Sequence, residues 1–375
     1  MTADVYERLA EHLDNLPAGY PRTESGVEMR ILRQLFTPEE AELAVSLSLI
    51  EEEARVVARR AKLPVAEVAG RLEAMEKKGL IFSFQRDGSP PKYQATPFAV
   101  GFYEFQVNRL DPENVKDYEE YLSSWLDHDL WAKIPQTRTI PVGESIDAEA
   151  EILSYERAEE LVRAHRRFAV APCICRRERR IAGEGCDKPL ESCLSFGTAA
   201  KYYVRNELGR EISREEALQI LQGAEKAGLV LQPGNAKKPQ FICACCGCCC
   251  GILGNIKRHP RPAEIVSSPF VAAVDVDECD ACGICETRCQ MEAISVDTGY
   301  ALVDLGRCIG CGLCVTTCPS EAIVLTRKPA AEQRPVPRDV VDTNIKLAQA
   351  RGKLGAGEMV AMFVKSRVDR LLAPR

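Results

Sequence analysis

The sequence predicts a multidomain α+β protein in which several small domains follow one another along the chain. Residues 28–105 combine helical periodicity with short strand-like runs, and ten cysteines crowd residues 173–250. Eight further cysteines form two copies of one spacing between residues 279 and 318. A chain of 375 residues is long enough to build more than one hydrophobic core.

Changes in periodicity and composition divide the chain into six expected segments. They are a lead-in with one helix (1–27), a domain of helices and a hairpin (28–105), a helical connector (106–165), a cysteine-rich domain (166–270), a duplicated cysteine module (271–327), and a linker with a C-terminal helix (328–375). We expect the aromatic residues of the connector to be core residues. In the last segment, the apolar positions Val360, Val364, Val368 and Leu371 recur at helical spacing, which favours a docking helix over a membrane-surface helix.

The second segment is expected to contain four helices and a hairpin. The helices are expected at residues 28–36, 37–50, 51–61 and 65–81. In the fourth, Val65, Val68, Leu72 and Met75 recur every three to four residues. Two strand-like runs around Asp87-Gly88 then predict the hairpin. This run from helix to hairpin resembles winged-helix domains of the MarR and ArsR type, which implies a winged-helix-like fold.

A similar helix–turn–strand unit is expected in the cysteine-rich segment. Ser213 and Glu216 have the spacing of a capping box at the start of a helix, and Gly228 is placed to end it. The following KAGLVLQ echoes the earlier KKGLIFS. We therefore expect a diverged copy of the same local unit.

Eighteen cysteines are the most unusual feature of the composition. Adjacent pairs such as Cys245 and Cys246 rarely satisfy disulfide geometry, and no secretory signal or apolar membrane-spanning run is recognisable. We expect a cytoplasmic protein whose cysteines bind soft metals or iron–sulfur clusters, because thiolates at such short spacing suit both.

The strongest motif is a duplicated run of four cysteines. The first copy holds Cys279, Cys282, Cys285 and Cys289, and the second, 29 residues later, holds Cys308, Cys311, Cys314 and Cys318. At the same offset Gly283 matches Gly312, while Gln290 takes the position that Pro319 has in the second copy. Eight cysteines in this repeat favour clusters over zinc, which needs only four ligands.

Residues 275–326 resemble bacterial-type ferredoxin domains that hold two [4Fe–4S] clusters. The resemblance implies that the last cysteine of each run serves the other cluster. One cluster then has the ligands Cys279, Cys282, Cys285 and Cys318, and the other has Cys308, Cys311, Cys314 and Cys289. Gln290 departs from the proline usual in the family, without removing a ligand. The whole chain also resembles multi-cluster iron–sulfur proteins of anaerobic bacteria, a resemblance that brings no settled function.

The other ten cysteines form two groups whose spacing does not identify a cluster type. They are Cys173, Cys175, Cys186 and Cys193 in the first group, and Cys243, Cys245, Cys246, Cys248, Cys249 and Cys250 in the second. We expect at least one additional iron–sulfur cluster with ligands from both groups; zinc and redox-active thiols are the alternatives. Six arginines between residues 166 and 180 form either a solvated basic face, which we prefer, or a site for an anionic ligand.

These features favour an iron–sulfur electron-transfer protein, or the electron-transfer subunit of an anaerobic oxidoreductase, with redox proteins as partners. Two alternatives remain: a redox-sensing regulator that binds DNA, and a reductase with its catalysis at the middle cysteines. DNA is disfavoured as a partner because the fourth helix of the winged-helix-like segment is nearly neutral. No catalytic residue can be named, and no nucleotide-binding glycine motif is present.

Overall fold

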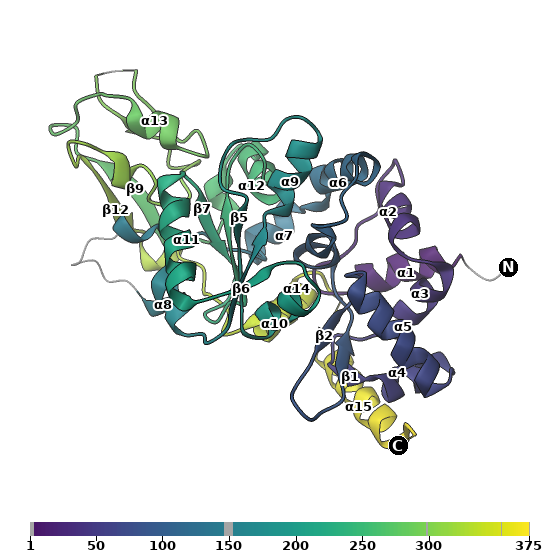
Figure 1. The fold of residues 1–375 in the computed structure, drawn as a ribbon. Helices are drawn as coiled ribbons and strands as arrows, with labels where there is room; N and C mark the ends of the chain where they lie inside the picture. The colour runs from purple at the N-terminus through teal and green to yellow at the C-terminus, as the bar shows by residue number, and fades with distance from the viewer. Residues whose placement is uncertain (1–3, 146–152, 298, 354, 375) are drawn as a thin grey trace. The chain divides into compact units, whose positions relative to one another are not determined.

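The structure is a computed structural model, and it describes residues 4–145, 153–297, 299–353 and 355–374 (Figure 1). Residues 146–152 of the expected connector lie outside this range. The chain divides into two compact units. Unit 1 comprises residues 1–125, 205–208 and 344–375, and unit 2 comprises 126–204 and 209–343. Among the described residues, no helix has both the length and the apolar character needed to cross a bilayer.

Unit 1 consists mainly of helices, with one small antiparallel sheet. Its helices are α1 (Val5–Asp14), α2 (Val27–Leu35), α3 (Pro38–Ala44), α4 (Ala54–Ala61), α5 (Val65–Lys77), α6 (Pro112–Trp125) and α15 (Ala356–Leu372). Its strands are β1 (Glu52–Glu53), β2 (Phe82–Phe84) and β3 (Lys92–Gln94), in the order β1-β3-β2. Buried aromatic residues form much of its core, and the rings of Phe98 and Tyr121 lie 4.8 Å apart.

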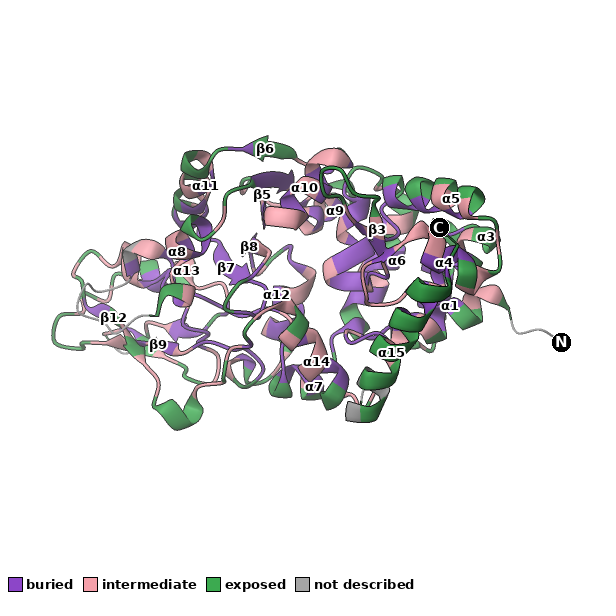
Figure 2. Cartoon of the chain, turned by 90° about the horizontal axis from the view of Figure 1, so that it is seen from below, coloured by how far each residue is buried: buried purple, intermediate pink, exposed green. Residues whose placement is uncertain are grey.

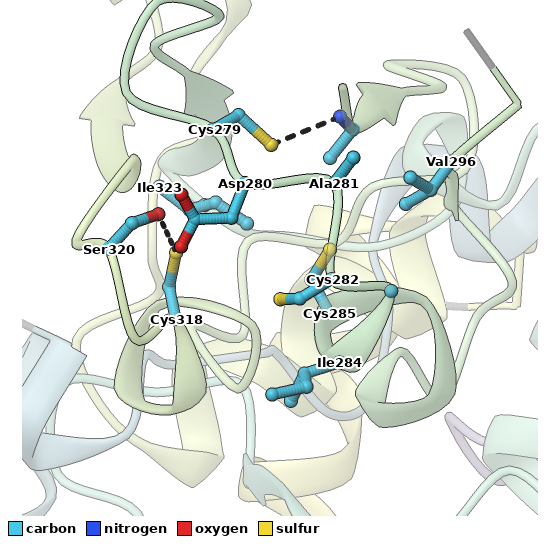
Figure 3. A pocket seen from close by; sticks show the side chains of 12 residues that line it. Cys279, Asp280, Ala281, Cys282, Ile284, Cys285, Val296, Cys318, Ser320 and Ile323 are labelled. Carbon is cyan, nitrogen blue, oxygen red and sulfur yellow. Dashed lines mark hydrogen bonds between the residues drawn. The ribbon is translucent and has the colours of Figure 1, made fainter. Parts of the chain in front are cut away.

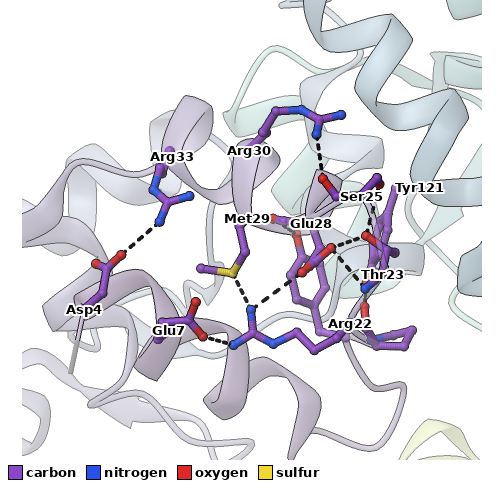
Figure 4. A network of polar contacts seen from close by, with 12 residues as sticks. Asp4, Glu7, Arg22, Thr23, Ser25, Glu28, Met29, Arg30, Arg33 and Tyr121 are labelled. Atoms are coloured by element: carbon purple, nitrogen blue, oxygen red, sulfur yellow. Dashed lines mark hydrogen bonds and ion pairs between the residues drawn. The ribbon is translucent and has the colours of Figure 1, made fainter.

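The start of α2 is held by a buried carboxylate. Glu28 is 2% exposed and accepts hydrogen bonds from the backbone N–H and the hydroxyl of Thr23. Arg22 lies 3.6 Å from the same carboxylate and also pairs with Glu7 on α1 (Figure 4). A buried charge is costly unless it is paired in this way, so these contacts tie the loop before α2 to both helices.

Two of the expected helices of this unit are wrong in extent. The stretch 37–50 is helical only to Ala44, and Glu52–Glu53 forms strand β1 instead of the start of a helix. Ser48 explains the break, because its hydroxyl accepts from the backbone N–H of Ile50 and donates to Glu52, which favours a turn. The fourth expected helix is confirmed as α5, although it ends at Lys77, four residues before the expected end. The hairpin is confirmed as β2–β3, and Gly88 has a positive φ at its turn.

Helix α15 does not pack in the way its apolar pattern indicated. Val360, Val364, Val368 and Leu371 are all exposed, as is Phe363 (Figure 2). Ser366 and Asp369 are buried, as is Ala373 just after the helix, and Asp369 pairs with Arg59 and Arg60 of α4. The helix is therefore held by its polar face.

Unit 2 is built around a five-stranded antiparallel sheet in the order β6-β4-β5-β8-β7. Its strands are β4 (Phe168–Pro172), β5 (Glu191–Phe196), β6 (Arg210–Ile212), β7 (Val230–Pro233) and β8 (Phe241–Cys245). Its helices are α7 (His128–Lys133), α8 (Ala158–Arg163), α9 (Ile174–Ile181), α10 (Gly197–Arg205), α11 (Arg214–Lys226) and α12 (Gly251–Arg258), with the last residue of α10 assigned to unit 1. Helix α14 (Val340–Ala350) leads the chain back into unit 1.

The expected second helix–turn–strand unit is confirmed in unit 2. Ser213 caps α11 by accepting a hydrogen bond from the N–H of Glu216, and Gly228 follows the helix at φ +70°. Strand β7 starts two residues after this glycine. The chain leaves α5 for β2 through Gly79 at φ +74°, so the two segments share one local design.

The duplicated cysteine module also lies in unit 2 and contains two small two-stranded sheets. Its elements are β9 (Phe270–Val274), α13 (Ile284–Arg288), β10 (Ile294–Ser295), β11 (Leu302–Val303) and β12 (Ile323–Arg327). Strand β9 pairs with β12, and β10 pairs with β11. Each sheet therefore joins the start of one sequence copy to the end of the other.

Candidate metal centres

The sequence duplication is repeated in the backbone of the module. Three pairs of residues with positive φ are separated by 29 positions: Ala281 and Gly310, Gly283 and Gly312, and Glu292 and Glu321. Alanine and glutamate rarely adopt this conformation, so its recurrence at matched positions marks a constrained loop. The two cysteine runs thus fold around the same loop geometry.

The strand pairing interleaves the two copies. Ile294 pairs with Val303, and Ile323 pairs with Val274, so the two registers are related by the same shift of 29 residues. The strand that follows each cysteine run is hydrogen-bonded to the strand that precedes the other run. The last cysteine of each run therefore lies near the loop of the other run. This topology brings each fourth cysteine to the other run.

The first pocket of the module is lined by Cys279, Cys282, Cys285 and Cys318, together with apolar side chains (Figure 3). The backbone N–H of Ala301 donates to the Cys279 sulfur at 3.4 Å, and the Ser320 hydroxyl lies 3.7 Å from the Cys318 sulfur. Such donors stabilise thiolate charge. The set fits a [4Fe–4S] cluster, because four thiols from two loops surround one pocket.

Cys308, Cys311, Cys314 and Cys289 form a second set of thiols that interact electrostatically. Burial raises the pKa of Cys311 to about 12, and it also raises the pKa values of Cys308 and Cys314. Buried thiols of this kind are stable as thiolates only beside compensating positive charge, which bound iron supplies. Backbone N–H groups of Ala293 and Ala272 donate to Cys289 and Cys308.

Comparison with known proteins identifies an iron–sulfur segment around the second cysteine run. The family model described as a 4Fe-4S binding domain matches residues 301–324, which include the cysteines from 308 to 318. This part of the chain is a ferredoxin-type iron–sulfur segment. No curated protein and no solved structure matches the chain significantly.

The ten middle cysteines separate into two groups of unequal size. Cys186, Cys246, Cys248 and Cys249 have their sulfur atoms within 4.8 Å of one another. The other six form a chain of hydrogen-bonded thiols, in the order Cys193, Cys243, Cys245, Cys250, Cys175, Cys173. Both groups draw on the two sequence clusters, as the sequence led us to expect for a shared centre.

The six-thiol group is built by the central strands of the sheet and by two helix starts. Cys193 on β5 is in register with Cys243 on β8, and Cys245 follows on the same face two residues later. Cys175 lies in the first turn of α9, and Cys250 caps α12, accepting from the N–H of Leu253 at 3.3 Å. Hydrogen bonds from Cys175 and Cys245 lower the pKa of Cys250 to about 6.

Arg176 on α9 lies between the two groups. It is 1% exposed and donates to the carbonyl of Ala244 at 3.0 and 3.1 Å, and its Nη1 is 3.8 Å from the Cys246 sulfur. Burial lowers the pKa of Arg176, but its interactions with the sulfurs of Cys173 and Cys246 outweigh this and raise it. The preferred interpretation of the arginines as a solvated face is therefore wrong for Arg176, whose guanidinium is buried beside cysteine sulfurs.

The loop that carries Cys246 and Cys248 touches the duplicated cysteine module at Gln290. The Gln290 side-chain oxygen accepts a hydrogen bond from the Gly247 N–H at 2.9 Å. A Cβ at position 247 would lie 2.4 Å from the Gln290 carbonyl oxygen, so only glycine permits this approach. The residue that departs from the family proline thus links a middle-cysteine loop to the chain next to Cys289.

Sequence reasoning missed the division into four and six thiols, the interior role of Arg176 and the contact of Gln290. One signal was available in the sequence. Cys243 and Cys245 alternate with Ile242 and Ala244, which is the pattern of a strand with both cysteines on one face. The partner strand that places Cys193 opposite Cys243 had no such local signal.

Proposed function

We propose that this protein transfers single electrons, either as an independent carrier or as the electron-transfer subunit of an anaerobic oxidoreductase. A [4Fe–4S] cluster supplies one-electron redox chemistry when bound. The proposed ligands are Cys279, Cys282, Cys285 and Cys318 for one cluster, and Cys308, Cys311, Cys314 and Cys289 for the other. The main support is the interleaved strand pairing, which brings a fourth thiol from the other run to each loop.

The proposal includes a further iron–sulfur centre in the middle domain. The six-thiol group supports it, because each of its cysteines interacts with the next in the order Cys193, Cys243, Cys245, Cys250, Cys175 and Cys173. Six thiols exceed the four that a structural zinc ion takes, and Arg176 provides a positive charge beside them. The residues of this chain would thus bind the centre, offset its charge and exclude water from it.

The domain boundaries expected from the sequence belong to this proposal, including a winged-helix-like domain over residues 28–105. The sheet order β1-β3-β2 and the position of α5 before the β2–β3 hairpin support that fold. We propose that this domain binds protein partners. Its α4 arginines are engaged internally: Arg60 pairs with Glu52 and Asp369, and Arg55 with Glu53.

Anaerobic purification followed by iron and sulfide counting tests the proposal. The two clusters alone require at least about eight irons and eight sulfides per chain. Replacing Cys289 by alanine should damage the cluster that Cys308, Cys311 and Cys314 hold, and leave the other cluster intact by electron paramagnetic resonance. Damage restricted to the cluster of the run that contains Cys289, or about four irons in the unaltered protein, would overturn the assignment.

A further inference from the structure

The four-thiol group differs in kind from the other cysteine sites of the chain. Cys186 comes from the loop between α9 and β5, whereas Cys246, Cys248 and Cys249 come from the turn before α12. The sulfur–sulfur distances are 4.0 Å for Cys186–Cys246, 3.6 Å for Cys186–Cys249 and 3.7 Å for Cys248–Cys249. All four sulfurs lie within 4.8 Å of one another.

These distances match one tetrahedral ion. Four thiolates at about 2.3 Å from a single zinc-like ion stand about 3.8 Å apart along the edges of the tetrahedron. A [4Fe–4S] cube requires a wider arrangement, because each thiolate binds a different corner iron. The observed separations therefore favour a mononuclear site.

The ferredoxin-type module provides the internal comparison. Within the part of the chain that the structure describes, the four-thiol group is the only set of three or more ligand side chains whose donor atoms all lie within 4.8 Å of one another. The cysteines of the module line a pocket instead and stand farther apart. The same chain thus builds two different kinds of thiol site.

The surroundings of the four thiols suit the charge of such a complex. A divalent ion with four thiolates has a net charge of −2. The Arg176 guanidinium lies 3.8 Å from Cys246, and the backbone N–H groups of Lys188 and Cys186 donate to Cys186 and Cys249. Cys248 is exposed, so an ion can reach the site from solvent.

We propose that Cys186, Cys246, Cys248 and Cys249 bind a single thiophilic divalent ion, Zn²⁺ or Fe²⁺, at a site separate from the six-thiol group. Binding forms four metal–sulfur bonds and releases one proton for each ligand that starts as a thiol, so four protons leave a fully protonated site. No electron is transferred on binding. The ion joins two loops that are about 60 residues apart in the sequence, which stabilises the fold around β5 and β8.

The test compares two exposed cysteines by single substitution in the full chain, prepared anaerobically. Cys248→Ala should lose one zinc or iron per chain and keep all of its sulfide. Cys282→Ala, the matched control in the ferredoxin-type module, should lose cluster iron and sulfide but retain the single ion. If Cys248→Ala instead loses about four irons with four sulfides, the site holds a cube and the proposal is wrong.

Spectroscopy of the unaltered protein gives the same answer without a variant. Zinc-edge X-ray absorption should show four sulfur neighbours at about 2.3 Å and no neighbouring metal. If the ion is iron, Mössbauer spectra should contain one high-spin tetrahedral ferrous site in addition to the cluster signals. Finding neither species would overturn the proposal, and would do so even if the eight irons and sulfides of the module were found.

Discussion

Gln290 and Pro319 occupy equivalent positions in the two cysteine runs, and the glutamine contacts the middle domain at Gly247. Gln290 accepts from the N–H of Gly247, between two of the four clustered thiols, and directly follows Cys289. Hydrogen bonds to the residues next to metal ligands help to orient those ligands. We therefore interpret the departure from proline as a local adaptation that fixes the turn bearing the middle cysteines.

Gln290→Pro should be compatible with the local backbone, because Pro319 occupies the equivalent place. It should leave the Gly247 N–H without a partner and lower the free energy of unfolding by about 1 kcal/mol. Anaerobic urea titration measures this as a lower midpoint at unchanged slope. Gln290→Glu keeps the acceptor and is the control, so an equal loss in both variants would contradict the role assigned to the side-chain oxygen.

Arg176 is a second residue whose substitution should have a large effect. Arg176→Met keeps most of the volume but removes the donors to the Ala244 carbonyl and the positive charge beside Cys173 and Cys246. Breaking a buried charged pair on one side costs about 3–5 kcal/mol. We expect metal loss from the middle cysteines, measured by elemental analysis, while the exposed Arg163 on α8 serves as a control for substitution to methionine. Full metal content in Arg176→Met would contradict this role.

Among the secondary-structure elements, α15 has the apolar face that its periodicity predicted, but the face buried within unit 1 is a different one. Its apolar residues are exposed, while Arg60 on α4 donates to Asp369 at 2.7 Å and the Ser366 hydroxyl donates to Glu52 at 2.6 Å. The hydrophobic pattern predicted the helix but could not reveal partners about 300 residues away in the sequence. In contrast, α5 and α11 were predictable because their apolar positions, the glycines that follow them and the Ser213 cap of α11 are local signals.

Asp369→Asn should loosen α15 without unfolding the rest of unit 1. Losing the ionic hydrogen bond should lower the free energy of opening α15 by about 1 kcal/mol. This corresponds to roughly fivefold faster hydrogen exchange in α15 peptides, measured by mass spectrometry. Val364→Ser on the exposed face is the control and should leave exchange unchanged. Equal exchange in Asp369→Asn and unaltered protein would show that the pair does not hold the helix.

The same contact should respond to acid. Burial raises the pKa of Asp369, but hydrogen bonds from Arg60 and Arg59 outweigh it, so the pKa is lowered overall. A lowered folded-state pKa stabilises the contact at neutral pH, and this stabilisation is lost as the pH falls below about 4. Relative to the intrinsic exchange rate at each pH, exchange in α15 should therefore rise in that range in the unaltered protein but not in Asp369→Asn. An acid response that is the same in both would exclude Asp369 as its source.

At the scale of the whole molecule, the metal sites were predictable only where the sequence repeats. The 29-residue offset identified both runs of the module, because each cysteine of one run could be checked against the matching cysteine of the other. The middle cysteines have no second copy in the sequence with which their spacing could be compared. Their division into four and six depends on which strands become neighbours in the sheet, and the loop with Cys186 meets Cys246 only through long-range folding.

The charges of unit 1 bear on the proposal that it docks to proteins and binds DNA only weakly. In α5, Arg71 pairs with Glu67, and Lys78, which directly follows the helix, pairs with Glu40; the α4 arginines hold Glu52, Glu53 and Asp369. Duplex binding draws on cations free to replace phosphate counterions, and these cations are already neutralised by carboxylates. We therefore expect weak DNA binding that disappears at moderate salt and is equal for oxidised and reduced protein.

Anaerobic gel-shift titrations with dithionite-reduced and oxidised protein measure both properties. A redox-sensing regulator would instead bind a specific site with nanomolar affinity at physiological salt, and its affinity would change by about tenfold or more, ~1.4 kcal/mol, with redox state. Glu67→Gln provides a sharper version of the test, because it frees Arg71 and should strengthen non-specific binding slightly while leaving any redox dependence unchanged. Tight, sequence-specific and redox-dependent binding by the unaltered protein would make the clusters a sensor and overturn the electron-transfer proposal. Weak, salt-sensitive and redox-independent binding would support the proposal that this helical unit docks to proteins, with the cation pairing as the reason for its weak binding to DNA.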